Sequence, residues 1–401
     1  SYGETGNDNI LDSDGDPDYY PYQTLYGLGY KNGSEAGAYF TVIANPSLKW
    51  ETQISTDIAL EFGLFDRLTG TIEYFKKDSK DLLFDVSQPA SVGVTSIIQN
   101  IGKVTNSGVE IELDYNAFKN KDWSVSVGAN ATFVKNKIKN LPATMKENGY
   151  ISGSKKWLEG KSIYEFWLRQ WHGVDPQTGD GLYVADVSKY NQGNIGTGDG
   201  NITQSQFDEY KKTVVTIDGK ELTNSYTYAK YDFSGSSIPD VYGGFNVRVS
   251  YKNFDLAAVF SYQLGGQILD TNYATMMSMT EFGYAQSPDL LKAWKQAGDI
   301  TEVPRIDNSA AHTTNIGQSY STRWLTSSDY LNLRSVTIGY QLPKTWLSKV
   351  MLKSARLNLT AENLFMLKAR QGLNPMANYS GVTYNEYMPS RNITLGLNVS
   401  F

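Results

Sequence analysis

Apolar and polar residues alternate along much of the chain with a repeat of two residues. Successive side chains of a β-strand point to opposite faces of a sheet, so this repeat predicts strands with one apolar and one polar face. It is clearest in the last residues, where the apolar positions are Ile393, Leu395, Leu397, Val399 and Phe401. We expect such strands over residues 53–64, 68–74, 109–115, 123–133, 245–251, 254–262, 336–342, 357–361 and 393–401, with a partial strand at residues 1–3.

The lengths of these strands and of their connections favour a membrane barrel over a water-soluble sandwich. Many segments reach roughly 10–14 residues, and ten tilted residues rise about 25 Å, the height of the apolar band of an outer-membrane barrel. Short turns at residues 65–67, 119–121 and 252–253 alternate with long connections, as periplasmic turns alternate with extracellular loops in such barrels. The long connections are residues 85–105, 137–240, 265–327 and 366–389. We predict an all-β chain that forms part of a transmembrane antiparallel β-barrel.

The two predicted faces differ in charge. The apolar positions carry no formal charge, as exposure to lipid requires. Aromatic residues near strand ends, such as Tyr74 and Trp123, are placed where an interfacial girdle would lie. We expect the charged residues of the opposite face to line a wet lumen: Glu61, Glu110, Glu112, Arg248, Arg356 and Glu362.

Composition excludes several functional classes. The 401 residues include 28 Tyr and 36 Gly but no Cys, so a disulfide scaffold, a thiolate zinc site and a cysteine nucleophile are excluded. His172 and His312 are the only histidines, too few for a His-rich metal site. A net charge of −6 gives no electrostatic footprint for nucleic acid. No catalytic-triad spacing, phosphate loop or H-E-x-x-H motif is present, so we predict that the protein is not an enzyme.

The chain is expected to be part of a longer protein. It begins at Ser1 without Met, a basic segment or an apolar leader. About nine strands and a partial one would leave unpaired sheet edges in a bilayer, so we expect the remaining barrel strands to come from elsewhere in the same polypeptide. Two helices are predicted between strands: residues 288–297, framed by Ser287 and Gly298, and a short turn opened by Pro343.

Several sequence strings resemble the SusC/RagA family, the TonB-dependent outer-membrane transporters of Bacteroidetes. They occur in family order along the chain: NPSLKWET (45–52), YFKKDSKDLL (74–83), QNIGKVTNSGVEIEL (99–113), GVDPQTGDGLY (173–183), YLNLRSVTIGYQLP (330–343) and RLNLTAENLF (356–365). The resemblance implies a plugged barrel of about 22 strands, of which this chain is the C-terminal half. It also implies TonB as energy donor and a SusD-like surface lipoprotein as a lid. The expected function is import of a nutrient oligomer, either a glycan or an oligopeptide.

Two aromatic-rich stretches are candidates for substrate binding in the predicted extracellular loops. Aromatic faces stack on sugar rings or on apolar parts of peptides, although they equally pack one loop against another. The candidate substrate-binding residues are Tyr19, Tyr20, Tyr22, Tyr26, Trp167 and Trp171.

A possible structural calcium site is the only cofactor suggested by the sequence. The string GTGDGNITQSQFDEY (196–210) is similar to a calcium loop, in which oxygen ligands alternate around a glycine turn. Asp199 and Asp208 are the candidate ligands, but Ile195, Thr197 and Gln206 occupy positions where a calcium loop has oxygen ligands, most of them carboxylates.

The sequence is also compatible with other functions. The same architecture would suit a siderophore or cobalamin receptor, and a barrel without a plug would be a porin or an adhesin. A soluble β-rich module that binds glycans is compatible with the overall charge count. For the barrel reading, the expected partners are outer-membrane lipid, the remaining barrel strands, TonB, the lid lipoprotein and the oligosaccharide or peptide substrate.

Overall fold

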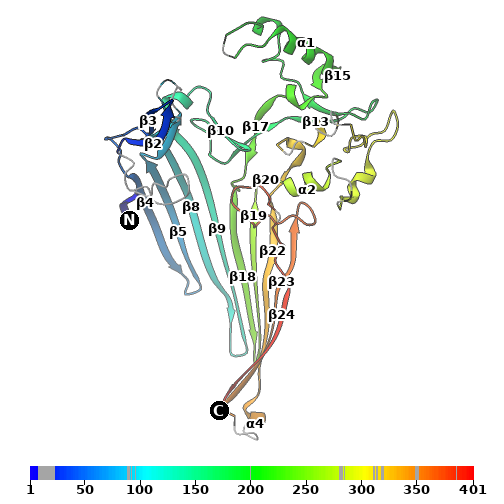
Figure 1. Ribbon diagram of the computed structural model, residues 1–401. Coiled ribbons are helices and arrows are strands. Elements are labelled where there is room, and N and C mark those ends of the chain that lie inside the picture. The colour runs from blue at the N-terminus through cyan, green and yellow to red at the C-terminus, as the bar shows by residue number, and fades with distance from the viewer. Residues whose placement is uncertain are drawn as a thin grey trace.

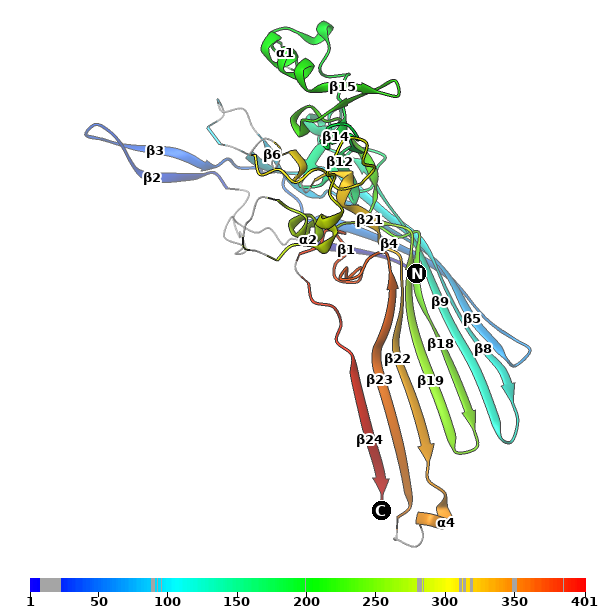
Figure 2. The same cartoon turned by 90° about the vertical axis from the view of Figure 1, so that its right-hand side faces the viewer.

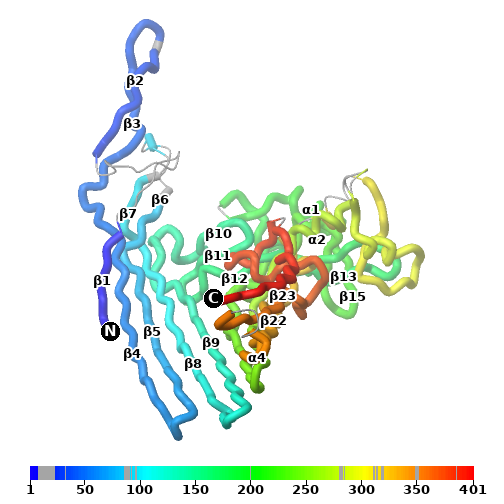
Figure 3. Tube along the Cα trace, turned by 90° about the horizontal axis from the view of Figure 1, so that it is seen from below, coloured from blue at the N-terminus to red at the C-terminus, as the bar shows by residue number. Residues whose placement is uncertain are grey.

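One large antiparallel sheet organises the chain. The computed structural model describes residues 1–7, 23–87, 91, 93–94, 96–198, 200–279, 283, 285–309, 312, 315–317, 320–347, 352–384 and 386–401. Ten strands lie side by side in an order that follows the chain, and the sheet is curved when seen from below (Figures 1 and 3). They are β1 (Tyr2–Asn7), β4 (Glu51–Leu64), β5 (Leu68–Lys80), β8 (Lys103–Lys119), β9 (Trp123–Asn140), β18 (Val241–Tyr251), β19 (Phe254–Leu264), β22 (Tyr330–Gln341), β23 (Ser354–Lys368) and β24 (Asn392–Ser400).

The strand register joins the apolar positions into one continuous outer face. Leu60 pairs with Ile72 across β4 and β5, and Leu359 pairs with Leu395 across β23 and β24. These side chains are exposed, 63% for Leu60 and 70% for Leu395. Contiguous apolar exposure of this extent is unfavourable in water but suits hydrocarbon. The predicted transmembrane strands are therefore confirmed, and the six charged positions expected to line the lumen lie on the opposite, inner face.

The two ends of the sheet differ as predicted. At one end the strands are joined by tight turns; Phe65, Asp66 and Lys252 adopt positive φ angles of 56°, 53° and 51° to close them. Figure 1 shows α4 (Lys344–Leu347), the helical turn expected after Pro343, at the same end. The long connections all leave from the other end, which short-turn topology assigns to the cell exterior.

The long connections fold into small sheets and helices of their own. Because the large sheet faces lipid on one side and the lumen on the other, the buried apolar clusters lie in these connections, around Phe166 and around Tyr210. Figure 2 shows most of these connections above the strands, whereas the β2–β3 hairpin projects to one side. Their strands are β2 (Leu25–Asn32), β3 (Glu35–Val42), β6 (Leu83–Ser87), β7 (Ser96–Asn100), β10 (Tyr150–Ser152), β11 (Lys155–Trp157), β12 (Glu165–Arg169), β13 (Trp171–Val174), β14 (Gly181–Val184), β15 (Val214–Ile217), β16 (Lys220–Thr223), β17 (Tyr231–Ser236), β20 (Gln267–Leu269) and β21 (Leu325–Ser327).

The helices are short, and one of them differs from its prediction. Among the described helices the two longest are α1 (Gln204–Thr213) and α2 (Thr271–Met276). The helix expected over residues 288–297 is only a 3-10 helix, Pro288–Lys292, although Ser287 caps it as predicted. It ends early because the Trp294 amide donates to the Val303 carbonyl at 3.0 Å and the indole Nε1 donates to the Pro176 carbonyl at 2.9 Å. These long-range bonds override local helix propensity. None of the helices in the described ranges has the length and apolarity needed to cross a membrane.

A charge placed on the outer face should destabilise the sheet in lipid. Leu395→Arg and Val127→Arg are expected to lower the free energy of unfolding by about 2–4 kcal/mol, because each puts a guanidinium into hydrocarbon. Thr394→Arg and Ser126→Arg, one residue away on the inner face, are the matched controls and should be mild. Unfolding of the protein in phospholipid vesicles, followed by tryptophan fluorescence, measures the difference. Equal losses on both faces would contradict the assignment of the outer face to lipid.

Candidate functional site

The inner face of the sheet carries the charged residues expected to line the lumen. The register aligns Glu61 on β4 with Thr71 on β5, and Thr71 with Glu112 on β8, which lies on the same face as Glu110. By the same alternation, Arg248, Arg356 and Glu362 occupy inner-face positions of β18 and β23. The structure thus places all six residues on the polar side, opposite the exposed apolar side chains.

An ion pair crosses a strand on this inner face. The Arg356 Nη2 atom on β23 lies 2.5 Å from the Asp255 Oδ2 atom on β19, although β22 runs between these strands. The position beneath the pair is Gly339, where a Cβ atom would come within 2.3 Å of Arg356 Nη2 and 2.6 Å of Asp255 Oδ1. Only glycine leaves this space, so Gly339 permits the pair that ties three strands together.

A β-bulge interrupts β22 further toward the exterior. Ser335 pairs with Val259 and Leu333 pairs with Phe260, which leaves Arg334 as an extra residue without a partner position on β19. On the other side, Asn363 of β23 takes a positive φ of 52° beside the same irregularity. Bulges re-aim side chains and are over-represented next to functional sites. Here the bulge brings an arginine to the polar side of the sheet.

A groove of about 620 Å³ opens at this bulge. Such a volume is typical of ligand pockets, about 300–1,000 Å³. The charged groups on its wall are Arg334 and Glu362, and the remaining lining residues are Val259, Ser261, Asn332, Ser335, Asn363, Met376 and Pro389. Among the described lining residues, most are polar and none is aromatic.

Asn332 lies at the bottom of this groove and is incompletely satisfied. Its side chain is buried, and its amide nitrogen lies 4.0 Å from the Met376 sulfur, a weak acceptor. The Oδ1 atom has no hydrogen-bond partner within the described part of the chain. An unpaired buried acceptor costs about 1–3 kcal/mol, a cost that structures tend to retain at functional sites.

Two of the aromatic candidates, Trp167 and Trp171, are built into the loop assembly. Trp167 on β12 packs edge-on against Phe233, with ring centroids 4.9 Å apart, and the Lys156 ammonium lies 4.1 Å from its ring centroid. Trp171 on β13 packs edge-on against Tyr183 at 5.1 Å. Both therefore have packing roles in the extracellular loops, and a role in substrate binding stays a prediction.

The half-buried Arg323 cation holds the loops around Trp171. The Arg323 guanidinium lies 4.7 Å from the Trp171 ring centroid and 4.3 Å from that of Trp324, and it donates to the Ile316 carbonyl at 3.1 Å. Burial lowers the pKa of Arg323 to about 10 and raises that of Tyr183 to about 12. Both groups keep their usual charge at neutral pH, so the cation–π cluster persists across the physiological range.

The remaining aromatic candidates do not gather with the tryptophans. Tyr26 lies on β2, in a hairpin that projects away from the loop assembly (Figure 2), and packs against Phe40 with ring centroids 4.9 Å apart. Tyr19, Tyr20 and Tyr22 lie outside the described residues.

The two candidate ligands of the suggested calcium loop, Asp199 and Asp208, cannot be compared as a site. Asp199 lies outside the described residues, and Asp208 lies on α1, where its Oδ1 atom accepts from Gln204 Nε2 at 2.8 Å. Thr203 and Gln206 form a capping box at the start of α1, so Gln206 is occupied in starting the helix. In the described portion of the chain, no three acidic or histidine side chains cluster closely enough to hold a metal ion.

Sequence reasoning missed the groove, although a signal for it exists. Leu331 and Leu333 are apolar at odd positions, whereas Val336 and Ile338 are apolar at even positions. This one-residue change of phase marks the bulge at Arg334, because each bulge shifts which side chains face outward. The burial of Asn332 and the proximity of Met376 depend on a distant loop and had no local signal.

The two-faced sheet with tight turns at one end and large folded loops at the other defines an outer-membrane β-barrel wall. A family model described as "TonB dependent receptor-like, beta-barrel" matches residues 14–364. The chain therefore belongs to the family of TonB-dependent receptor β-barrels, and it is an outer-membrane protein. The similarity to SusC/RagA proteins predicted from the sequence strings is confirmed by the relatives that follow.

Similar proteins are much longer than this chain. TonB-dependent receptor P3 of Formosa agariphila is 29% identical over 100% of this chain and 39% of its own length. TonB-dependent receptor SusC of Bacteroides thetaiotaomicron is 25% identical over 100% of this chain and 37% of its own. The solved structure of the RagAB peptide transporter matches all of this chain and 40% of that chain, with 25% identity and a TM-score of 0.74. The chain thus spans about two fifths of the length of these relatives.

The extracellular hairpin of β10 and β11 should become more stable as the pH rises above 7. The Lys155 ammonium donates to the Tyr164 carbonyl at 2.8 Å and lies 3.1 Å from the Phe166 ring centroid. Burial lowers the pKa of Lys155 to about 7, partly opposed by the charge of Glu165. The folded pKa is below the unfolded value of about 10.4, so between these values the unfolded hairpin binds more protons and stability rises with pH, by at most about 1.4 kcal/mol per pH unit.

Hydrogen exchange of the hairpin amides at pH 6 and pH 9, corrected for intrinsic rates, measures this dependence. Lys155→Met should remove most of it, because the variant has no ammonium to desolvate. Lys220→Met, at the exposed start of β16, is the control. If Lys155→Met kept the pH dependence of the unchanged protein, the assignment to Lys155 would be wrong.

Proposed function

We propose that this chain supplies part of the wall and outer loops of a TonB-energised importer, and that its cargo is an oligopeptide. The observation that carries the proposal is the groove at the β22 bulge, where Arg334 and Glu362 line one cavity on the inner face. A guanidinium and a carboxylate in one groove suit a ligand that carries both charges, as a peptide does at its termini and side chains. The family membership supports TonB as the energy donor.

The chemistry of the groove favours a peptide over a neutral glycan. Sugar rings are commonly bound on aromatic faces, and the part of the lining that the structure describes presents none. Asn332 and Ser261 add amide and hydroxyl groups that suit a peptide backbone. The similar protein of known structure is named as a peptide transporter, which agrees with this choice. A siderophore or cobalamin cargo lacks a comparable supporting observation.

A surface lipoprotein of the SusD type is the proposed partner on the exterior. The connection that follows β20 and α2 exposes large apolar side chains: Leu291 is 78% exposed and Ile300 is 95% exposed. Trp294 anchors this connection to Pro176, so its apolar tips are held outward on a fixed support. Exposed apolar groups on a rigid extracellular surface suit burial against a partner protein.

Removing either charge from the groove should weaken peptide binding. Arg334→Ala and Glu362→Gln are each expected to lower affinity by about tenfold, the loss of one charge-assisted hydrogen bond. The measurement is uptake by whole cells and binding by the purified protein, with a pool of oligopeptides as the probe and a neutral malto-oligosaccharide for comparison. Arg248→Ala, also on the inner face but outside the groove, is the matched control. Unchanged peptide binding in both groove variants, or stronger binding of the glycan, would refute the peptide proposal.

Charged residues on the exposed apolar tips should release the lid. Leu291→Glu combined with Ile300→Glu is expected to reduce copurification of the lipoprotein by about tenfold or more, because buried apolar anchors dominate interface energy. The control is Val215→Glu, which likewise places a carboxylate on an exposed apolar side chain, here on β15. A heat-dependent shift in electrophoretic mobility verifies that the barrel is intact. Retention of the lipoprotein at the level of the unchanged protein would exclude this surface as its contact.

A further inference from the structure

Five lysines project from the outer face at the extracellular end of three neighbouring strands. The alternation that points Tyr74, Val109 and Phe133 toward lipid continues outward along the same strands into basic residues. These are Lys76 and Lys80 on β5, Lys103 on β8, and Lys135 and Lys137 on β9. The face that is apolar at membrane depth therefore carries these lysines two to six residues further along the strands, a rise of about 7–20 Å.

Only one carboxylate is paired with this cluster on the strands. Asp78 lies 3.1 Å from the Lys76 ammonium and 3.2 Å from that of Lys103, and it accepts from the Thr105 hydroxyl at 2.6 Å. In the described part of the chain, Lys80, Lys135 and Lys137 form no ion pair. Lys135 and Lys137 are exposed, so their ammonium groups are accessible to an anion.

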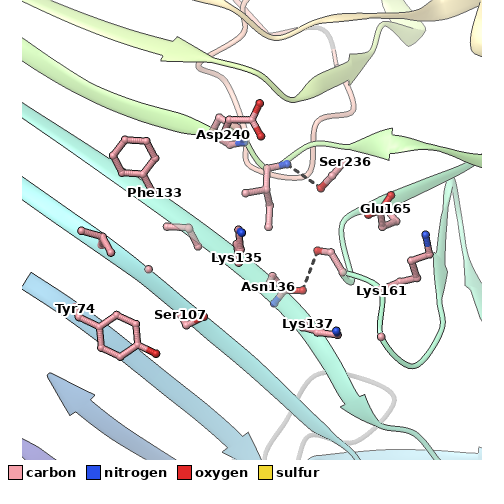
Figure 4. A pocket seen from close by; sticks show the side chains of 17 residues that line it. Tyr74, Ser107, Phe133, Lys135, Asn136, Lys137, Lys161, Glu165, Ser236 and Asp240 are labelled. Atoms are coloured by element: carbon pink, nitrogen blue, oxygen red, sulfur yellow. Dashed lines mark hydrogen bonds between the residues drawn. The ribbon is translucent and has the colours of Figure 1, made fainter.

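A groove of about 770 Å³ lies beside these lysines. Tyr74, Val109 and Phe133 form its apolar part over β5, β8 and β9, while Lys135 and Lys137 lie at its outer part (Figure 4). On the loop side it is lined by Lys161 together with the carboxylates of Glu165 and Asp240.

Hydrogen bonds fix the loop that borders this groove. The Gly160 amide donates to the Ile138 carbonyl at 2.9 Å, and the Ile138 amide donates to the Lys161 carbonyl at 2.8 Å. The Ser162 hydroxyl and the Ile163 amide both donate to Asn136 Oδ1 at 2.9 Å. The loop is thereby attached to the part of β9 that extends beyond its pairing with β18, so the groove is part of the folded wall.

We propose that this lysine groove binds the phosphorylated headgroup of an outer-leaflet lipid. The groove is continuous with the lipid-facing surface, and its apolar part lies where an acyl chain would run. Its cationic part lies one to two residue pairs further out, at the level of headgroups. Lysine ammonium groups bind phosphate as point charges, which tolerates the varied geometry of a lipid headgroup. Continuity with the lipid face favours a lipid over a soluble anion or a second protein.

The test uses the protein purified from outer membranes and measures binding of doubly phosphorylated lipid A presented in detergent micelles. Lys135→Gln combined with Lys137→Gln should weaken binding by about thirtyfold, because two surface charges that attract the phosphates are lost. Lipid A without phosphates should bind the unchanged protein weakly. Lys119→Gln combined with Lys121→Gln, at the opposite end of β8, is the matched control and should bind lipid A normally.

Further arms separate the lipid from other anions and from misfolding. Lys135→Arg combined with Lys137→Arg should retain binding, and the heat-dependent mobility shift should persist in every variant used. Inorganic phosphate should not displace the lipid at millimolar concentration; full displacement would overturn the assignment to a lipid. Unchanged lipid A binding in the glutamine variant, or an equal loss in the control at the short turns, would also overturn it. Loss of the lid lipoprotein from the glutamine variant with lipid binding intact would instead identify a protein contact.

Discussion

The structure depends on one constraint: in hydrocarbon, each backbone amide and carbonyl must be satisfied by a neighbouring strand. The ten-stranded sheet meets this by pairing its strands in register along lengths of 9 to 18 residues for β4 through β24. With the backbone satisfied, side chains alone decide which face meets lipid. The alternation of Leu60 with Glu61, repeated strand after strand, separates a lipid surface from a polar wall.

The same constraint explains why the buried apolar clusters lie in the extracellular connections. Neither face of the sheet can hold a large dry core, because one contacts lipid and the other is polar. The chain therefore buries its apolar clusters in the extracellular connections, around Phe166 and Tyr210. Fixed loops in turn allow defined surfaces: the tips near Leu291, the floor of the groove at Asn332, and the loop at Ser162 that borders the lysine groove. Each proposed contact with cargo, lid or lipid uses a loop that is anchored by hydrogen bonds to a strand or to another loop.

Charged side chains come together where the alternation of apolar and polar residues along a strand is interrupted. At Gly339 the absence of a side chain lets Arg356 reach Asp255 across a strand. At Arg334 an extra residue turns a cation toward the polar side, beside Glu362. On β5 and β9 the outward-facing series changes from Tyr74 and Phe133 to Lys76 and Lys135, the level at which we propose that headgroups lie. In such a barrel wall, an interruption of the apolar–polar alternation therefore points to candidate binding residues.

The sequence by itself determined the strands, their two faces and the tight turns, because a period of two and turn chemistry are local properties. The family was indicated by the resemblance of its sequence strings to SusC/RagA proteins. Alternation along each strand also assigned six charged residues to one face: Glu61, Glu110, Glu112, Arg248, Arg356 and Glu362. The tertiary structure decided which residues each side chain contacts, which alternation along a strand cannot show. The truncated helix at Pro288, the packing of Trp167 and Trp171, and the groove between Arg334 and Met376 all arise from contacts between residues distant in sequence. Strand alternation states which way a side chain points, but only register and loop docking state what it meets there.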